Sequence, residues 1–149
     1  MEAADRPETF GLLKETCREA VAELDAGAAL FSRVIGDLLL ELAEHTTSGQ
    51  TLHLGHEYLI SDYPLTQEVI RTCESRTVSL LDANPDPKEA ELLTELGFES
   101  LLMVPVFAHG ECWGLLEVYG TAGRRFDAAD VDLAKAIVTR TASRLQAGR

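Results

Sequence analysis

The chain has 149 residues, 46% of them hydrophobic, so it is long enough to bury one core and short for two domains. Thirteen Lys and Arg residues against 25 Asp and Glu residues leave a formal net charge of −12. Such a surface repels phosphate backbones and anionic lipids, which argues against nucleic-acid and membrane partners. We expect one domain over residues 1–149, with residues 1–7 disordered.

The ends and the cysteines indicate where such a chain works. The opening segment MEAADRPE is acidic and has no apolar stretch, so no signal peptide is expected. The apolar runs Leu38–Leu42 and Leu101–Phe107 are far shorter than the ~20 residues of a membrane-spanning helix. Cys17, Cys73 and Cys112 are odd in number and widely spaced, which does not indicate a disulfide framework. We therefore expect a cytoplasmic protein.

The first third of the chain predicts a helix followed by strands. Apolar residues recur at helical spacing over Glu8–Leu24. Ala28–Ile35 and Asp37–His45 predict two strands joined by a tight turn. Because the stretch LLLELAE has no β-branched residue, a helix over Leu38–Leu42 is the alternative. Glu57–Ile60 adds a short strand after a polar loop.

The middle of the chain predicts two short helices with a strand between them. Pro64 suits the first turn of a helix that runs to about Glu74, and Thr77–Leu81 favours an extended strand. The segment Asp86–Glu89 supplies an N-cap aspartate, a first-turn proline and a third-position glutamate, an acidic variant of the capping box. That helix ends at Gly97.

Two apolar runs flank His109-Gly110 and predict a β-hairpin over Ser100–Gly120. Pairing of Ala108 with Glu111 would then assign every side chain to one of two faces. The first face is wholly apolar and predicts a helix against it: Leu101, Met103, Pro105, Phe107, Cys112, Gly114, Leu116 and Val118. The second face has three polar side chains, Ser100, Glu117 and Tyr119. Its other members are apolar: Leu102, Val104, Val106, Trp113 and Leu115.

The last helix is capped by Asp127 and carries Asp130 in its first turn, where a negative charge is favourable. Its apolar stripe is wide: Val131, Leu133, Ala134, Ile137, Val138, Thr141 and Leu145. A stripe of this width predicts a homodimer formed by the terminal helices as well as contact with the sheet.

Several of these segments resemble GAF domains, and the resemblance covers the chain from about Glu8 onward: Asp62–Leu65, Val78–Asp82, Glu89–Leu96, Leu101–Val106, His109-Gly110, Trp113–Tyr119 and Phe126-Asp127. The resemblance implies an α+β, profilin-like fold. Its antiparallel sheet would have five or six strands, with the terminal helices on one face and two shorter helices on the ligand face.

The same resemblance implies a sensory or regulatory role in signal transduction, in which a small ligand or a partner shifts a dimer. No kinase, cyclase or DNA-binding segment follows Arg149. We therefore expect either a piece of a longer signalling protein or a module that acts through a partner with an output domain. The ligand's identity is left open.

The second hairpin face is the predicted ligand site, because aliphatic walls with few polar groups are typical of small-molecule pockets. The expected ligand-binding residues are Ser100, Leu102, Leu115, Glu117, Tyr119, Asp62, Tyr63, Cys73 and Phe98. Glu117 is the expected anchor, because a buried carboxylate costs several kcal/mol unless solvent, a hydrogen-bonding neighbour or a ligand cation meets it. A water-facing strand glutamate is the alternative.

The sequence motifs of metal binding, cyclic-nucleotide binding, bilin attachment and serine hydrolysis are incomplete or missing. His53 and His56 suggest a metal site, but the HExxH spacing and further converging ligands are missing, so no metal and no cofactor is expected. The sequence lacks the motif that accompanies cyclic-nucleotide binding in GAF domains, and it lacks a Cys-His pair for covalent bilin attachment. It also lacks GxSxG, the local motif of a Ser-His-Asp triad.

Some GAF proteins reduce free methionine sulfoxide with cysteines, one of them in a PGHxAC-like segment. Asn84–Pro87 stands in that neighbourhood without a cysteine, and Cys73 lacks an evident resolving thiol. We expect structural cysteines and no enzyme. A thiol-dependent reductase of that type and a ligand-free dimerisation module are the alternatives.

Overall fold

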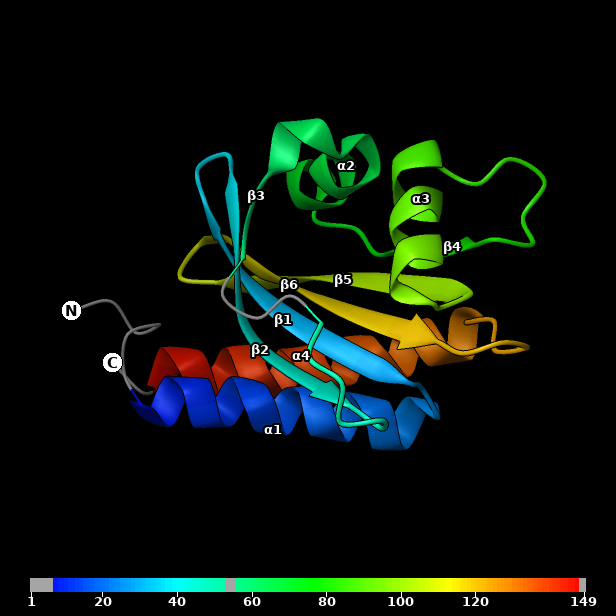
Figure 1. The fold of residues 1–149 in the computed structure, drawn as a ribbon. Helices are drawn as coiled ribbons and strands as arrows, with labels where there is room; N and C mark the ends of the chain where they lie inside the picture. Colours follow the sequence, from blue (N-terminus) through cyan, green and yellow to red (C-terminus); the bar gives the residue numbers. More distant parts are fainter. Residues whose placement is uncertain (1–6, 53–55, 148–149) are drawn as a thin grey trace.

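A six-stranded antiparallel sheet in the order β3-β2-β1-β6-β5-β4 forms the middle layer of the protein (Figure 1). The computed structural model describes residues 7–52 and 56–147. The strands are β1 Ala28–Ile35, β2 Leu38–Thr46, β3 Glu57–Leu59, β4 Arg76–Ser79, β5 Ser100–Ala108 and β6 Glu111–Gly120. The predicted strand over 37–45 is therefore confirmed, and its helical alternative is wrong.

Helices cover both faces of the sheet (Figure 1). The terminal helices α1 (Pro7–Leu24) and α4 (Ala128–Ala147) lie side by side on one face. The short helices α2 (Pro64–Thr72) and α3 (Pro87–Leu96) lie over the other, after the 3-10 turn η2 (Ile60–Asp62). This arrangement confirms the predicted α+β class. Residues 1–6, most of the segment expected to be disordered, lie outside the described residues.

The terminal helices run in opposite directions. A buried hydroxyl pair joins Thr16 to Thr141 at 2.7 Å, and Arg140 forms an ion pair with Glu19 at the surface. The wide apolar stripe of α4 is used within the chain, where Val131 and Leu133 are partly buried and five members are buried: Ala134, Ile137, Val138, Thr141 and Leu145. Ala142, outside the predicted stripe, is buried with them. Packing on its own domain thus accounts for the width of the stripe.

The β5–β6 hairpin contains a β-bulge that the predicted register did not include. Ala108 pairs with Glu111 as expected, and Phe107 pairs with Cys112. The next pair is Val106 with Gly114, so Trp113 is the extra residue on β6. Because side chains alternate, one inserted residue exchanges the two faces of one strand relative to the other.

The predicted faces of the hairpin are therefore wrong for β5 and for the turn end of β6. The side toward α1 and α4 carries Leu102, Val104, Val106, Ala108, Trp113, Leu116 and Val118. The side toward α2 and α3 carries Leu101, Met103, Leu115 and Tyr119. The outer half of β6, from Leu115 to Tyr119, keeps its predicted assignment.

A second bulge lies between β1 and β2. Phe31 pairs with Ala43 and Ser32 pairs with Glu41, so Leu42 is the extra residue. Ala43 belongs to the core under the terminal helices, whereas Leu39 belongs to the core under α2 and α3. Because of this bulge, Leu39 and Glu41, near the start of β2, point to the same face of the sheet as Tyr119.

The described part of the chain, 7–52 and 56–147, contains no helix that is both long and apolar enough to cross a membrane.

Candidate functional site

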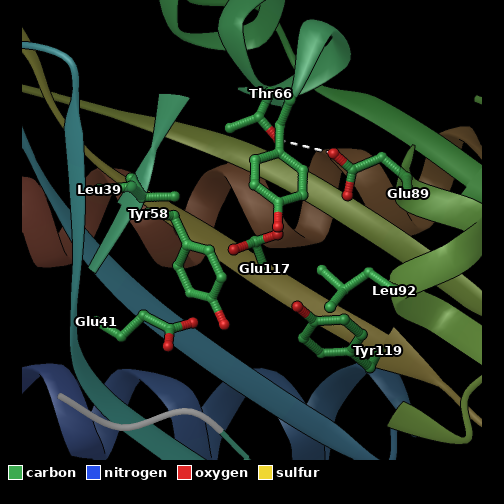
Figure 2. Close-up of a pocket in the computed structure, with 9 residues that line it drawn as sticks. Leu39, Glu41, Tyr58, Thr66, Glu89, Leu92, Glu117 and Tyr119 are labelled. Carbon is green, nitrogen blue, oxygen red and sulfur yellow. Dashed lines mark hydrogen bonds between the residues drawn. The ribbon is translucent and has the colours of Figure 1, made fainter. Parts of the chain in front are cut away.

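A small cavity lies between the sheet and the two short helices (Figure 2). Its volume is about 20 Å³, roughly the room of one water molecule. Four parts of the chain supply its walls: β2, β6, the segment from β3 to α2, and α3. The lining residues are Leu39, Glu41, Tyr58, Tyr63, Thr66, Glu89, Leu92, Glu117 and Tyr119.

Three buried glutamates line this cavity. Glu41 comes from β2, Glu117 from β6 and Glu89 from the first turn of α3, and none is more than 5% exposed. In Figure 2 the carboxyl groups of Glu41 and Glu117 and the hydroxyls of Tyr58 and Tyr119 point toward a common space. Among the described residues that line the cavity there is no Lys, Arg or His.

Hydrogen bonds satisfy these carboxyl groups unequally. Thr66 donates to Glu89 Oε2 at 2.9 Å, and the Tyr119 side chain beside Glu117 acts to lower the pKa of that carboxyl. Glu41 Oε1 is buried and accepts no hydrogen bond from any described residue, and the buried hydroxyl of Ser32 beside it is in the same position. Since buried polar atoms are nearly always hydrogen-bonded, these orphaned atoms indicate a missing partner at this face of the sheet.

The cavity favours uncharged acids when it holds no ligand. Burial first, and then the Glu89 carboxylate, raise the pKa of Glu117 to about 8, although the Tyr119 side chain acts to lower it. Burial first, then Glu117 and Glu44, raise the pKa of Glu41 to about 9. Burial likewise raises the pKa of Glu89, although the Thr66 hydrogen bond opposes this. Desolvation disfavours charge here, so near neutral pH the protonated form of these carboxyls is favoured unless a cation lies beside them.

Two half-exposed tyrosines stand where the cavity meets the surface. The rings of Tyr58 and Tyr63 make an edge contact with centroids 5.8 Å apart. The ammonium of Lys88 lies 5.8 Å from the centroid of the Tyr63 ring. Both rings line the cavity and belong to the short segment from β3 to the start of α2.

The predicted site residues divide into three groups. Glu117, Tyr119 and Tyr63 line the cavity. Leu115 is fully buried on the same face without lining it, and Phe98 stacks on Tyr119 with centroids 5.3 Å apart. These five residues do lie together.

The remaining four predicted residues lie elsewhere. The Trp113 bulge puts Leu102 in the core under the terminal helices, and Ser100, on the same side of β5, donates to the Arg124 carbonyl. Asp62 is exposed in η2. Cys73 follows α2 at the far end of that helix from Tyr63 and is exposed.

Sequence reasoning missed most of the acidic cluster. Glu41 reads only as a polar residue in an alternating strand, and the Leu42 bulge that turns it inward has no mark in the sequence. Glu89 reads as part of a capping box; its backbone N–H does donate to Asp86 at 3.1 Å, but its side chain accepts from Thr66. The usable signal was a glutamate between apolar neighbours in each of two strands.

A metal site at His53 and His56 can be examined only in part. His53 lies outside the described residues. Within 7–52 and 56–147, no three His, Cys, Asp or Glu side chains converge in a way that could hold a metal ion.

A six-stranded sheet with the terminal helices on one face, and with two short helices over a small cavity on the other, defines an α+β domain. The family model for the GAF domain matches residues 11–145, and the chain belongs to the GAF family. The suspected resemblance is thereby confirmed. Among curated protein sequences no relative was found.

Several solved structures similar to this fold are domains of phytochromes or related light receptors. The phycocyanobilin-bound GAF domain of a cyanobacterial phytochrome is 21% identical, with a TM-score of 0.80 over 93% of this chain and 84% of that one. The blue-light-absorbing GAF domain of PixJ from Thermosynechococcus elongatus is 12% identical, with a TM-score of 0.78 over 93% and 85%. The chromophore-binding domain of the Stigmatella aurantiaca bacteriophytochrome is 19% identical, with a TM-score of 0.75 over 99% and 57%. At these identities the likeness is one of fold.

Proposed function

We propose that this GAF domain is a sensory and regulatory module whose cavity binds a small ligand with a positive charge or several N–H donors. The observation that carries the proposal is Glu41 Oε1, a buried acceptor without a hydrogen bond among the described residues, in a cavity shared with Glu117 and Glu89. A ligand ammonium, amidinium or guanidinium group would satisfy that acceptor and let the neighbouring carboxyls ionise. An anionic or phosphorylated ligand would add charge of the wrong sign.

A bilin, such as the phycocyanobilin bound to the similar phytochrome domain, does not fit this cavity. A bilin carries propionate groups, which an acidic lining does not favour, and none of the described residues that line the cavity is a cysteine for covalent attachment. The residues present favour a compact cationic ligand.

Mass spectrometry of small molecules released from the purified protein is the first experiment. A thermal-shift panel of small amines, amidines and guanidines, with acetate and phosphate as anionic controls, is the second. We expect stabilisation by members of the cationic series only. Stabilisation by the anions alone would contradict the proposal. A cavity that takes nothing in either experiment would favour the ligand-free dimerisation module.

Glu117→Gln is expected to weaken binding of the tightest cation in the panel by roughly 1.5–3 kcal/mol, because a hydrogen bond to a charged group is lost while the shape is kept. Isothermal titration calorimetry at pH 7.5 measures this. Glu57→Gln, an exposed change on β3, is the matched control and should bind as the parent protein does. Equal affinity of parent and Glu117→Gln would show that Glu117 is no anchor.

We further propose that the module works in the cytoplasm, as its odd, widely spaced cysteines suggest, and passes its signal through a homodimer or a partner output domain. Light scattering at tens of micromolar is expected to give a dimer mass. Outward residues of α1 and α4 would form the contact, since the apolar stripe of α4 is already buried. Ala136→Glu, on the exposed side of α4, is then expected to give a monomer, with Glu57→Gln unaffected. A monomer in the parent protein would refute the homodimer.

A further inference from the structure

The residues around the cavity surround a space of water size with hydrogen-bond acceptors. Its volume is about 20 Å³, and a water molecule needs roughly 10–15 Å³ or more of such room. The carboxyl groups of Glu41 and Glu117 turn toward this space (Figure 2). The hydroxyls of Tyr58 and Tyr119 turn toward it as well. A ligand of water size therefore meets oxygen atoms from β2, β3 and β6 as these side chains stand.

Two buried polar atoms at the β2 side of the cavity indicate a partner that the described residues do not supply. Glu41 is 4% exposed, and its Oε1 has no hydrogen bond among the described residues. Ser32, its cross-strand partner on β1, is fully buried, and its hydroxyl is in the same position. Such atoms cost free energy unless a bound group satisfies them. Because an ionised carboxylate only accepts hydrogen bonds, the partner of Glu41 has to be a donor.

The charge of the lining decides which kind of donor is favoured. Glu41, Glu89 and Glu117 all line the cavity, and none of the described lining residues is Lys, Arg or His. A water molecule would fill the space but leave the carboxylates without a counter-charge. A metal ion would supply charge, but within 7–52 and 56–147 no three His, Cys, Asp or Glu side chains converge to hold one. A small cation that binds through N–H donors meets both conditions.

We propose that the ligand of this cavity is the ammonium ion itself. The inference rests on the cationic ligand proposed above and narrows it to one species. Ammonium is close to a water molecule in size and has an N–H donor at each corner of a tetrahedron. It therefore has one donor for each of the two carboxyls and the two tyrosine hydroxyls, and its bonds to the carboxylates are of the strong, charge-assisted kind. The half-exposed rings of Tyr58 and Tyr63 would attract the cation as it leaves bulk water.

Three other cations separate the parts of this argument. Potassium has the charge of ammonium and nearly its size, but it donates no hydrogen bond. Tetramethylammonium has the charge without any N–H group. Methylammonium keeps N–H donors and is larger by one methyl group. Comparison with ammonium therefore tests charge, donors and size separately.

Thermal unfolding at pH 7.5 in the chloride salts of these ions, with sodium chloride at equal ionic strength as the reference, is the first test. We expect ammonium to raise the unfolding midpoint in a saturable way, by roughly 3–6 °C at about ten times its dissociation constant. Potassium and tetramethylammonium should leave the midpoint at the sodium value. Equilibrium dialysis with ¹⁵N-labelled ammonium should give about one bound ion per chain.

The outcomes separate this inference from the proposed function. Stabilisation by methylammonium or larger amines, with no response to ammonium, would overturn the ammonium assignment and leave the cationic ligand standing. Equal stabilisation by potassium would also overturn it, because charge without N–H donors would then suffice. No response to any cation would overturn both, and a water molecule would then be the simplest partner of Glu41 Oε1.

Glu41→Gln is expected to weaken ammonium binding roughly 10- to 100-fold, because it removes the charge of one acceptor and keeps its shape. Should this variant fail to fold, Tyr58→Phe removes a single hydroxyl and is expected to weaken binding roughly three- to ten-fold. Glu57→Gln, the neighbouring exposed change on β3, is the matched control and should bind as the parent protein does. Unchanged affinity in both Glu41→Gln and Tyr58→Phe would mean that the ion binds elsewhere, and would overturn the proposal.

Discussion

The ligand-free domain is expected to lose stability as the pH rises from about 5 to about 9. Burial and neighbouring carboxylates raise the pKa of Glu117 to about 8 and that of Glu41 to about 9, from an ordinary 4.5 in the unfolded chain. The folded chain therefore keeps protons that the unfolded chain releases. This contribution to stability is complete below about pH 4.5 and is lost as the pH rises through 8 and 9. Because a pKa difference of 1 corresponds to about 1.36 kcal/mol, the raised pKa of Glu117 alone gives a loss on the order of 3–5 kcal/mol.

Urea unfolding at several pH values measures this loss. The double variant Glu41→Gln with Glu117→Gln, which cannot ionise, should show a much flatter dependence and exceed the parent protein in stability at pH 9. Glu57→Gln should follow the parent curve, because Glu57 is exposed. If the double variant kept the full slope, the buried acids would not be its source. A cation that binds should also release protons, so its affinity should increase over the same pH range.

Trp113→Ala is expected to lower the free energy of unfolding by roughly 3–5 kcal/mol, the usual cost of truncating a large buried aromatic side chain. Trp113 is 1% exposed, and its ring lies edge-on to Phe31 with centroids 6.2 Å apart. The Arg33 guanidinium lies 4.7 Å from the centroid of the same ring. The substitution thus removes core packing and a stacked cation together.

Phe107→Ala is the matched control for this prediction, since it truncates an aromatic residue of the same hairpin that is 58% exposed. It should change stability by no more than about 0.5 kcal/mol. Urea unfolding midpoints with a common slope give both values. Equal losses in the two variants would mean that the bulge does not put Trp113 in the core as described.

Element positions could be predicted from the sequence because their causes are local. The proline of α3, its Asp86 cap and the positive φ of 82° at Gly97 all follow from residue type, and the helix runs between them as expected. The turn at His109-Gly110 likewise follows from glycine, and the pair Ala108–Glu111 beside it is the predicted one. That the terminal helices cover one sheet face was implied by the resemblance to GAF domains.

The side-chain faces could not be predicted in full, because each bulge is a property of how two strands fit together. Nothing in the local sequence distinguishes Trp113 or Leu42 as the extra residue, yet each reverses which side of the sheet its neighbours occupy. The errors at Leu102 and Cys112 both follow from the first bulge. The omission of Glu41 from the site follows from the second.

The opposite course of α1 and α4 has a mechanical consequence. The beginning of α1 and the end of α4 lie at the same end of the sheet (Figure 1). Further along, the contacts of Thr16 with Thr141 and of Glu19 with Arg140 join the two helices. Pulling apart two segments attached at these points would load the helix pair like a zipper, one contact at a time. The sheet behind them would be spared until the seam had opened. The force needed to open that seam should therefore be small, and it should depend on the Thr16–Thr141 pair.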